Sequence, residues 1–308
     1  MRNAFFSELA DLMVHDSRIV FITGDLGYKL FDPLADIDPE RVINFGIRES
    51  AMVGFAAGLA KTGMLPFIYS IVPFITLRCL EQIKIDLCYN RCTAVVVGVG
   101  GGLTYGTNGP THHGVEDVGV LSCLPGLTIW TPCDSQEVRA CLRASGDMAQ
   151  PAYLRLGRGG EPLLHQPDGP LPDIAEPLVY GSVEQGMIIS FGHILHEVQQ
   201  ARKLLRQRGL EPAVVHLPTM QPFPQRRVAE LLAAGGPVLT VEEHVANGGL
   251  GSKVAVVMAE SGLSQKLRRL ALDRGFPESC MDRQTSLAWA GLDPVAIAAA
   301  YQDLAKRN

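Results

Sequence analysis

The residues that decide the fold are NFGIRESAMVGFAAGLAKTGMLPFIYS, positions 44–70. They connect a β-branched run at 41–46 to a second apolar run at 65–70. The segment between them, 49–61, has small and apolar residues that recur at helical spacing. Strand, helix and strand in this order are typical of a parallel sheet covered by helices. The helix begins with a carboxylate, Glu49, although almost everything that follows it is apolar.

The same alternation extends in both directions from this unit. It predicts an α/β fold with a mainly parallel sheet and helices on both faces. Further strands are expected at 19–24, 93–100, 127–132 and 152–157, with helices at 74–89 and 134–146.

A second, smaller α/β series follows a segment rich in proline and glycine. That segment, GGEPLLHQPDGPLPDIAEPLVYG, begins after Arg158 and has little periodicity, which is typical of an ordered connector. We therefore expect a first domain over 1–165, a linker over 166–180 and a second domain over 181–308. In the second domain, strands at 187–192, 213–218 and 237–244 alternate with helices at 194–208, 225–234, 249–260 and 294–305.

Composition narrows the class of function. The chain has 308 residues, 47% of them hydrophobic, and a net charge of −5 without a long run of like charges. Neither a nucleic-acid partner nor a membrane partner is indicated. The amino-terminal residues have helical spacing rather than the pattern of a signal peptide, and no apolar run approaches about 18 residues, so we expect a cytoplasmic protein.

The seven cysteines are expected to be reduced thiols. Cys88 and Cys92 have no second pair that would complete a tetrahedral metal site, so no metal ligand is assigned to this chain. Cys123 or Cys133 could serve as a nucleophile, but the nearby sequence offers no obvious base to orient either thiol.

Glu49 has two possible explanations. A glutamate in the first turn of a helix is stabilised by the helix dipole, by roughly 0.3–1 kcal/mol. However, the same helix contains Gly54 and Gly58, each of which costs about 1 kcal/mol relative to alanine in a helix interior. Close packing against a neighbouring helix would explain the glycines, and it would place Glu49 at a poorly solvated junction where a carboxylate needs a specific partner.

Residues 44–83, NFGIRESAMVGFAAGLAKTGMLPFIYSIVPFITLRCLEQI, resemble the core motif of the pyrimidine-binding domain of transketolase-like, thiamine-diphosphate-dependent enzymes. The resemblance implies that Glu49 hydrogen-bonds a ring nitrogen of the cofactor's aminopyrimidine and promotes its imino tautomer. It implies that Phe74 stacks on the pyrimidine and that Asp25 lies close to the thiazolium ring. Arg78, in the same motif, is expected among the cofactor-binding residues.

The resemblance also implies a set of substrate-binding residues. In TNGPTHH, His112 occupies the position of a histidine that orients or protonates the sugar oxygen near the reacting carbon. His113 and Asn108 are its neighbours in the same segment. Arg158 and Arg2 resemble arginines that contact the substrate phosphate, a role that suits the guanidinium fork because it can bond a phosphate bidentately.

Two positions depart from the pattern of sugar-phosphate transketolases. Gly100 stands where those enzymes commonly have a histidine, and Asn108 stands where they have an aspartate. We expect the wider, glycine-rich opening to admit a bulkier or modified sugar. The glycines at 98 and 100–102 do not have the G-x-G-x-x-G spacing, so a nicotinamide site is poorly supported.

The segment TVEEHVANGGLGSKVAVVMAE, residues 240–260, resembles the transketolase carboxyl-terminal domain. In the family this domain mostly braces the dimer. We therefore expect Glu242, Glu243 and His244 to be interfacial rather than catalytic.

The signature that holds Mg²⁺ and the diphosphate is not found: there is no G-D-G followed by paired asparagines. A diphosphate needs a metal ion and oriented amides to neutralise its charge. The resemblance therefore implies a separate, diphosphate-binding partner chain that supplies the Mg²⁺ ligands, with two copies of each chain in an α2β2 assembly.

The function predicted from the sequence is one subunit of a transketolase-like enzyme that transfers a two-carbon ketol unit between phosphorylated or modified sugars. One alternative is a decarboxylating enzyme with the same domain order, either a 2-oxoacid dehydrogenase beta subunit or a deoxyxylulose-phosphate-synthase-like protein. Another is a non-catalytic scaffold or regulatory partner. The joint presence of Glu49, Phe74, Asp25 and His112 argues against the scaffold.

Overall fold

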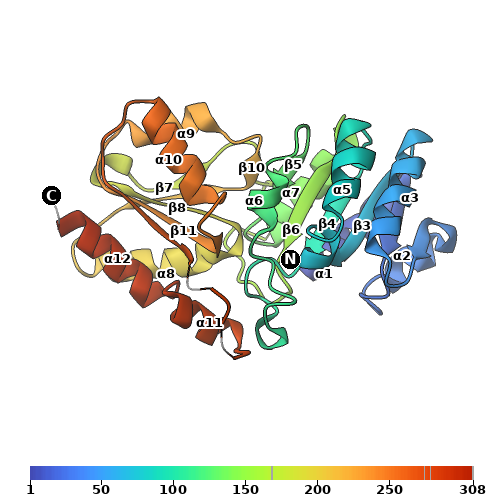
Figure 1. The fold of residues 1–308 in the computed structure, drawn as a ribbon, viewed down its shortest axis with the longest axis horizontal. Coiled ribbons are helices and arrows are strands. Elements are labelled where there is room, and N and C mark those ends of the chain that lie inside the picture. Colours follow the sequence, from blue (N-terminus) through green and yellow to red (C-terminus); the bar gives the residue numbers. More distant parts are fainter. Residues whose placement is uncertain (168, 274, 278, 307–308) are drawn as a thin grey trace.

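The computed structural model describes residues 1–167, 169–273, 275–277 and 279–306, which form two α/β units built on separate sheets (Figure 1). The two-domain α/β class predicted from the sequence is confirmed. No helix within these residues is both long and apolar enough to span a bilayer.

The first sheet has seven strands in the order β10-β5-β6-β4-β3-β1-β2. All neighbouring strands are parallel except β10 and β5. Strands β1 and β4 are buried along their whole length, as expected where helices cover both faces. The strands are β1 (Ile19–Thr23), β2 (Val42–Asn44), β3 (Leu65–Ile71), β4 (Val95–Val99), β5 (Thr128–Trp130), β6 (Ala152–Leu156) and β10 (Thr219–Gln221).

Helices pack on both faces of this sheet. One face carries α1 (Arg2–His15), α2 (Asp32–Ile37) and α7 (Ser135–Ala144), whose apolar side chains share a core with the strands. The other carries α3 (Glu49–Lys61), α4 (Val72–Ile75), α5 (Leu80–Gln82), the π-helix η2 (Ile83–Tyr89) and α6 (Asp117–Leu121).

The prediction of a single helix over 74–89 is wrong. The chain forms α4, turns, and resumes as α5 and η2. Within the turn the Thr76 hydroxyl donates to the Val72 carbonyl (2.6 Å), and the Arg78 amide reaches back to the Pro73 carbonyl (3.3 Å). The interruption leaves the Arg78 side chain half-exposed beside the start of α3.

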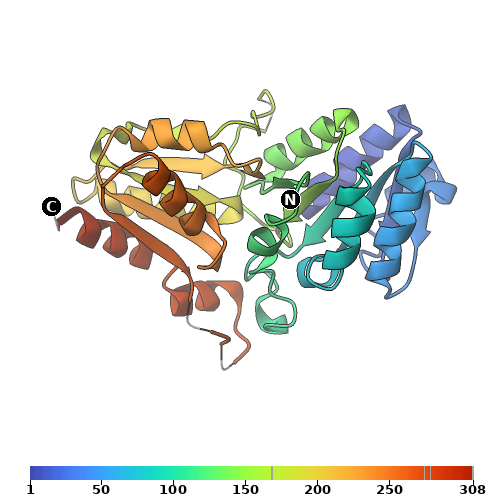
Figure 2. The ribbon, with the colours of Figure 1, turned by 45° about the horizontal axis from the view of Figure 1, so that its top comes forward.

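The second sheet has five strands in the order β12-β11-β8-β9-β7, parallel except for the β7–β9 pair. Helices α8 (Leu195–Arg206) and α12 (Pro294–Lys306) cover one face, while α9 (Gln225–Leu232) and α10 (Leu250–Glu260) cover the other (Figure 2). Helix α11 (Arg283–Ala290) follows the last strand. The strands are β7 (Leu178–Tyr180), β8 (Met187–Phe191), β9 (Ala213–Leu217), β11 (Val238–Val245) and β12 (Leu267–Leu272).

The two units are connected by the pairing of strands as well as by the linker. Strand β10 follows β9 of the second sheet but pairs antiparallel with β5, at the edge of the first sheet. Strand β7 lies at the end of the segment expected to be a connector, and it pairs with β9. The sequence patterns predict neither of these three-residue strands, nor β12, α2, α6 and α11.

Glu242, Glu243 and His244 connect parts of this chain, so the expectation that they brace a dimer is wrong. All three are at most 1% exposed. Glu243 accepts a hydrogen bond from the Leu103 amide (2.7 Å), and His244 accepts one from the Gly119 amide (3.1 Å), both across the boundary between the domains. Glu242 accepts the amides at the start of α10, at 2.7 and 2.9 Å. Buried polar groups need such partners, and here the same chain provides them.

Candidate functional site

Glu49 begins α3 immediately after a tight turn. The turn passes through Gly46, whose φ of 67° is a left-handed conformation that favours glycine. The Glu49 side chain is only 2% exposed. Its Oε1 accepts a hydrogen bond from the Ser70 hydroxyl of β3 (3.2 Å), and its Oε2 accepts one from Arg78 Nη1 (2.8 Å). The acid is therefore buried at a helix amino terminus with one counter-ion.

An aromatic cluster lies beside this carboxylate. The Phe74 ring, on α4, has the Arg78 guanidinium 4.6 Å from its centroid and the His112 ring edge-on at 5.2 Å. Arg78 thus contacts Glu49 and Phe74 at once. These contacts bring the end of β3 and the glycine-rich loop after β4 to one place at the carboxyl edge of the sheet, where functional groups of parallel α/β sheets usually gather.

His112 is held in this cluster by its neighbours. Its ring lies 5.6 Å from the ring of Tyr105, and its Nδ1 is 2.9 Å from the Thr111 hydroxyl. Burial lowers the pKa of His112 from its ordinary value, and the nearby His113 lowers it further. The ring is consequently neutral at neutral pH, with one nitrogen able to donate and the other able to accept a hydrogen bond.

Tyr105 fills the opening expected at Gly100. A Cβ built on Gly100 would lie 2.1 Å from two carbons of the Tyr105 ring. The glycine therefore lets the tyrosine ring pack against the backbone, and no free space is left there. The prediction of a wider opening at Gly100 is wrong. Tyr105 also lies under the Arg158 guanidinium, which is 5.1 Å from its ring centroid.

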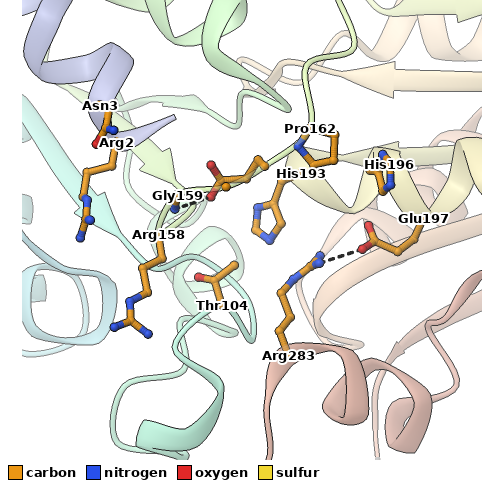
Figure 3. A pocket seen from close by; sticks show the side chains of 12 residues that line it. Arg2, Asn3, Thr104, Arg158, Gly159, Pro162, His193, His196, Glu197 and Arg283 are labelled. Carbon is orange, nitrogen blue, oxygen red and sulfur yellow. Dashed lines mark hydrogen bonds and ion pairs between the residues drawn. The ribbon is translucent and has the colours of Figure 1, made fainter.

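A cavity of about 590 Å³ lies between the two domains, and the same Arg158 that stacks on Tyr105 lines it (Figure 3). In this view the Arg2 and Arg158 side chains extend in the same direction. Buried Arg2 Nε has no hydrogen-bond partner in the described structure. The cavity is lined by Arg2, Asn3, Thr104, Arg158, Gly159, Gly160, Glu161, Pro162, His193, His196, Glu197 and Arg283.

Arg283, from the second domain, differs from the other two arginines of the cavity. It is bound to Glu197 (2.7 Å) and to Glu243 (2.9 Å), so its charge is already compensated. Arg2 and Arg158 are the guanidinium groups available to an anionic group of a ligand. Two guanidinium forks that line one cavity suit a phosphate or a sulfonate.

Three of the predicted site residues lie outside both the aromatic cluster and this cavity. Asp25 is exposed in the turn after β1, with a left-handed φ of 59°. Its carboxylate accepts hydrogen bonds from the Tyr28 hydroxyl and from the Asn44 side-chain amide, and these bonds lower the pKa of Asp25. Asn108 is exposed at the end of a short 3₁₀ turn. His113 is buried with Nε2 3.1 Å from the Gly106 carbonyl, and it lines a different cavity of about 150 Å³. Their roles toward cofactor or substrate stay predictions.

Arg155, three residues before Arg158, is a structural residue. It is 3% exposed and pairs with Asp117 at 2.8 Å. Its Nη2 donates to the carbonyls of Gly114 (2.7 Å) and Glu243 (3.1 Å), which ties the glycine-rich loop to the second domain.

Several residues of the site are not predicted by the sequence patterns. Tyr105 lies shortly after the three glycines at 100–102. An aromatic residue this close to a glycine run is the sequence feature that could have indicated its place in the site. The sequence gives no comparable signal for Thr104, His193 or Arg283. His193 and Arg283 reach the cavity only through the packing of the second domain on the first.

Comparison with known proteins covers both halves of the chain. Residues 1–160 match the family described as transketolase, pyrimidine binding domain, and residues 183–297 match transketolase, C-terminal domain. The chain is 32% identical to one subunit of the apulose-4-phosphate transketolase of Phocaeicola vulgatus, over 84% of each protein. It is 30% identical to a subunit of the 6-deoxy-6-sulfo-D-fructose transketolase of a Clostridium species, over 90% of this chain and 86% of that protein.

A solved structure has the same fold over nearly the full length. It is described as a split gene transketolase, inactive beta4 tetramer, and it superposes with a TM-score of 0.89 at 28% identity, over 99% of this chain and 98% of that chain. The resemblance found in residues 44–83 is thereby confirmed. The chain belongs to the transketolase family, as a subunit that joins the family's pyrimidine-binding domain to its C-terminal domain.

Proposed function

We propose that this chain is the pyrimidine-binding subunit of an enzyme that transfers a two-carbon ketol unit between sugars carrying an anionic group. Membership of the transketolase family implies thiamine-diphosphate-dependent transferase chemistry. The observation that carries the proposal is a buried acid, Glu49, joined through Arg78 to the Phe74–His112 cluster. Tyr105 in turn contacts both His112 and Arg158, which lines the cavity together with Arg2.

The residues present fit the aminopyrimidine half of thiamine diphosphate. Glu49 offers a buried carboxylate that can hold or release a proton at a ring nitrogen, and Phe74 offers an aromatic face. When bound, the cofactor supplies the electron sink for the transferred two-carbon unit. Asp25, at the end of β1, is proposed to face the thiazolium side of the site.

Arg78 has a preparatory role in this proposal. Its guanidinium makes the two contacts that the resemblance assigns to the aminopyrimidine, a hydrogen bond to Glu49 and a stack on Phe74. The Arg78 side chain is 47% exposed, so it can turn outward when the cofactor enters. Until then it supplies the positive charge that a buried carboxylate requires.

His112 is proposed to act on the substrate. Its neutral ring lies between Phe74 and Tyr105, where one nitrogen can donate to, or accept from, a sugar oxygen next to the reacting carbon. Arg158 and Arg2 are proposed to bind the anionic end of the sugar. Asn108 and His113 are proposed as further substrate contacts in the same loop.

The relatives suggest which sugars to test. One is named for apulose-4-phosphate and the other for 6-deoxy-6-sulfo-D-fructose. A phosphate and a sulfonate are both tetrahedral oxyanions, and the same pair of arginines suits either. We propose a phosphorylated or sulfonated modified sugar as the substrate class.

A partner chain is proposed to complete the site. The Mg²⁺ and diphosphate ligands of the family are expected from a diphosphate-binding subunit, in an α2β2 assembly. A solved relative described as an inactive beta4 tetramer supports this dependence.

The partner surface is proposed to begin at the site itself, along the outer face of α3. Gly54 and Gly58 lie on this exposed face. Apart from the neighbouring backbone of α3 itself, the nearest described atom to a Cβ built on Gly54 is Asp86 Oδ2 at 3.6 Å, and none lies within 4 Å of a Cβ built on Gly58. The neighbouring Ile47 and Tyr89 are 75% and 81% exposed, which is unusual for large apolar side chains. The two glycines would allow a partner helix to approach closely.

The proposed function is tested by mixing the chain with a diphosphate-binding transketolase subunit, thiamine diphosphate and Mg²⁺. Donor and acceptor sugars with and without a phosphate or sulfonate are screened for two-carbon transfer. Transfer that needs both chains and an anionic sugar supports the proposal. Release of CO₂ from pyruvate without ketol transfer would instead support the deoxyxylulose-phosphate-synthase-like or 2-oxoacid dehydrogenase alternatives.

A further inference from the structure

Cys133, Glu137 and His165 form a compact cluster at the opposite end of the first sheet from α3. Their ligand atoms, one from each residue, all lie within 4.8 Å of one another. Cys133 follows β5, Glu137 lies in the first turn of α7, and His165 comes from the connector between the domains. Cys133 and Glu137 are 2% and 0% exposed, while the His165 side chain is 19% exposed. Three segments thus bring a thiol, a carboxylate and an imidazole together in the interior.

One carboxylate oxygen of Glu137 is available to a ligand. Its Oε2 accepts hydrogen bonds from the Cys133 amide (2.7 Å) and from His216 Nε2 (2.9 Å). Its Oε1 is buried and has no hydrogen-bond partner among the described residues. A buried carboxylate oxygen without a partner is costly, so this atom requires an explanation.

The spacing around this oxygen suits a shared metal ion. Glu137 Oε1 lies 3.8 Å from His165 Nε2, which is too far for a hydrogen bond. Two ligands of a tetrahedral zinc ion, with bonds of about 2.0–2.3 Å, lie about 3.3–3.8 Å apart. A metal ion could therefore bridge these two atoms with little movement of either, and the Cys133 sulfur lies within 4.8 Å of both.

The side chains of His165 and Glu137 are each held in place by a further residue, as the ligands of metal sites usually are. His165 Nδ1 lies 3.0 Å from Asp134 Oδ2, which fixes the ring so that Nε2 faces the cluster. Asp134 also accepts the backbone amides of Leu164 (2.9 Å) and His165 (2.8 Å), and so holds the connector in place. His216, from β9 of the second domain, orients Glu137 in turn. A carboxylate behind a ligating histidine is a common feature of zinc sites.

We propose that Cys133 Sγ, Glu137 Oε1 and His165 Nε2 bind a zinc ion that fastens the connector to the first domain. The combination of thiolate, imidazole and carboxylate suits zinc better than magnesium or calcium. Binding releases the Cys133 proton to solvent and involves no redox step. The fourth position is taken by water, which reaches the ion past the partly exposed His165. This ion is distinct from the Mg²⁺ expected with the cofactor.

The experiment uses the full chain, purified with a non-chelating reductant, stripped with a chelator and titrated with Co²⁺. A thiolate-to-cobalt charge-transfer band should appear and saturate at one Co²⁺ per chain, and Zn²⁺ should displace it. One equivalent of Zn²⁺ should also raise the Tm by about 2–4 °C or more, because an ion that binds only the folded state stabilises it.

Matched variants separate this site from adventitious binding. Cys133→Ser should abolish the charge-transfer band, and His165→Gln should lower the zinc content measured by mass spectrometry at least about 10-fold. Cys123→Ser and His15→Gln, which alter an exposed thiol and an exposed imidazole, should behave as the unmodified chain does. If Cys133→Ser fails to fold, the titration of the unmodified chain decides alone. A titration with no thiolate band, or equal zinc content in all variants, overturns the proposal.

Discussion

The Glu49 carboxylate and the Arg78 guanidinium form an ion pair of 2.8 Å in which the acid is buried and the base is half-exposed. Arg78 extends from the turn between α4 and α5, and its side chain also covers the Phe74 ring. A buried acid is thus paired with a counter-ion that can leave without unfolding the chain. This relationship makes Glu49 suited to a second partner that arrives from outside.

Glu49→Gln should abolish most turnover and leave assembly intact. Glutamine keeps the size of the side chain and can still accept a hydrogen bond from Ser70, but it cannot exchange a proton with the cofactor. Since positioned acid–base groups contribute about 10²–10⁴-fold, we expect a loss of that size in kcat. Steady-state kinetics of the reconstituted enzyme measure it, and size-exclusion chromatography checks assembly.

The control for this change is Glu230→Gln, which removes an exposed acid on α9 that pairs with two neighbouring arginines. It should retain normal turnover. Normal turnover in Glu49→Gln would favour the scaffold alternative instead.

Arg78→Ala should destabilise the isolated chain through Glu49. The buried carboxylate would keep only its hydrogen bond from Ser70, so we expect a loss of about 1–3 kcal/mol in the free energy of unfolding. In a Glu49→Gln background the same change should cost much less, because no buried charge is left unpaired. Denaturant unfolding of the two single variants and the double variant measures the coupling. Strictly additive losses would show that the pair is not coupled.

His112 should control the acid limb of the activity profile. Burial holds its pKa below the ordinary value of 6.5, so the folded protein favours the neutral ring. As the pH falls below 6.5, the unfolded chain takes up the proton first, and the contribution of His112 to stability declines until the folded ring is also protonated. The acid limb of kcat/KM should therefore have its midpoint below pH 6.5.

His112→Gln tests this assignment, because glutamine can hydrogen-bond but does not titrate. It should lower kcat and flatten the acid limb. A limb that stays unchanged in this variant would assign the titration to another group.

Arg158→Ala should weaken the use of anionic sugars selectively. A hydrogen bond to a charged group is worth about 1.5–3 kcal/mol, so kcat/KM for a phosphorylated or sulfonated sugar should fall about 10- to 100-fold. The value for the matching uncharged sugar should hardly change. Arg226→Ala, which removes an exposed arginine of α9, is the control and should affect neither. An equal loss with both kinds of sugar would argue against an anion site at Arg158.

The sequence predicts the parts of the fold that rest on long apolar patterns. Strands β1, β3, β4, β6, β8, β9 and β11 are largely buried runs, and the predicted bounds of each fall within two residues of the observed ones. Strands β7 and β10 have three residues each and lie next to prolines, Pro177 for β7 and Pro218 and Pro222 for β10, so no longer apolar run marks them. The helix expected at 74–89 is wrong because the Thr76 and Arg78 contacts that interrupt it are not evident from periodicity.

The site residues that could be predicted are those in segments that resemble the family's motifs. Glu49, Phe74 and Arg78 lie in a single motif, and the structure brings them together with His112. The cavity beside them depends on the second domain, which contributes His193 and Arg283. The roles of Arg155 and Glu243 depend on burial between the domains, which composition and spacing do not reveal.

The most direct test of the central claim is the rate of two-carbon transfer by this chain with thiamine diphosphate, Mg²⁺ and an anionic sugar pair, measured with and without a diphosphate-binding partner subunit. We predict no turnover by the chain alone, turnover when both chains are present, and loss of that turnover when Glu49 is replaced by glutamine. Turnover by the isolated chain, or full activity of the reconstituted Glu49→Gln enzyme, would contradict the account.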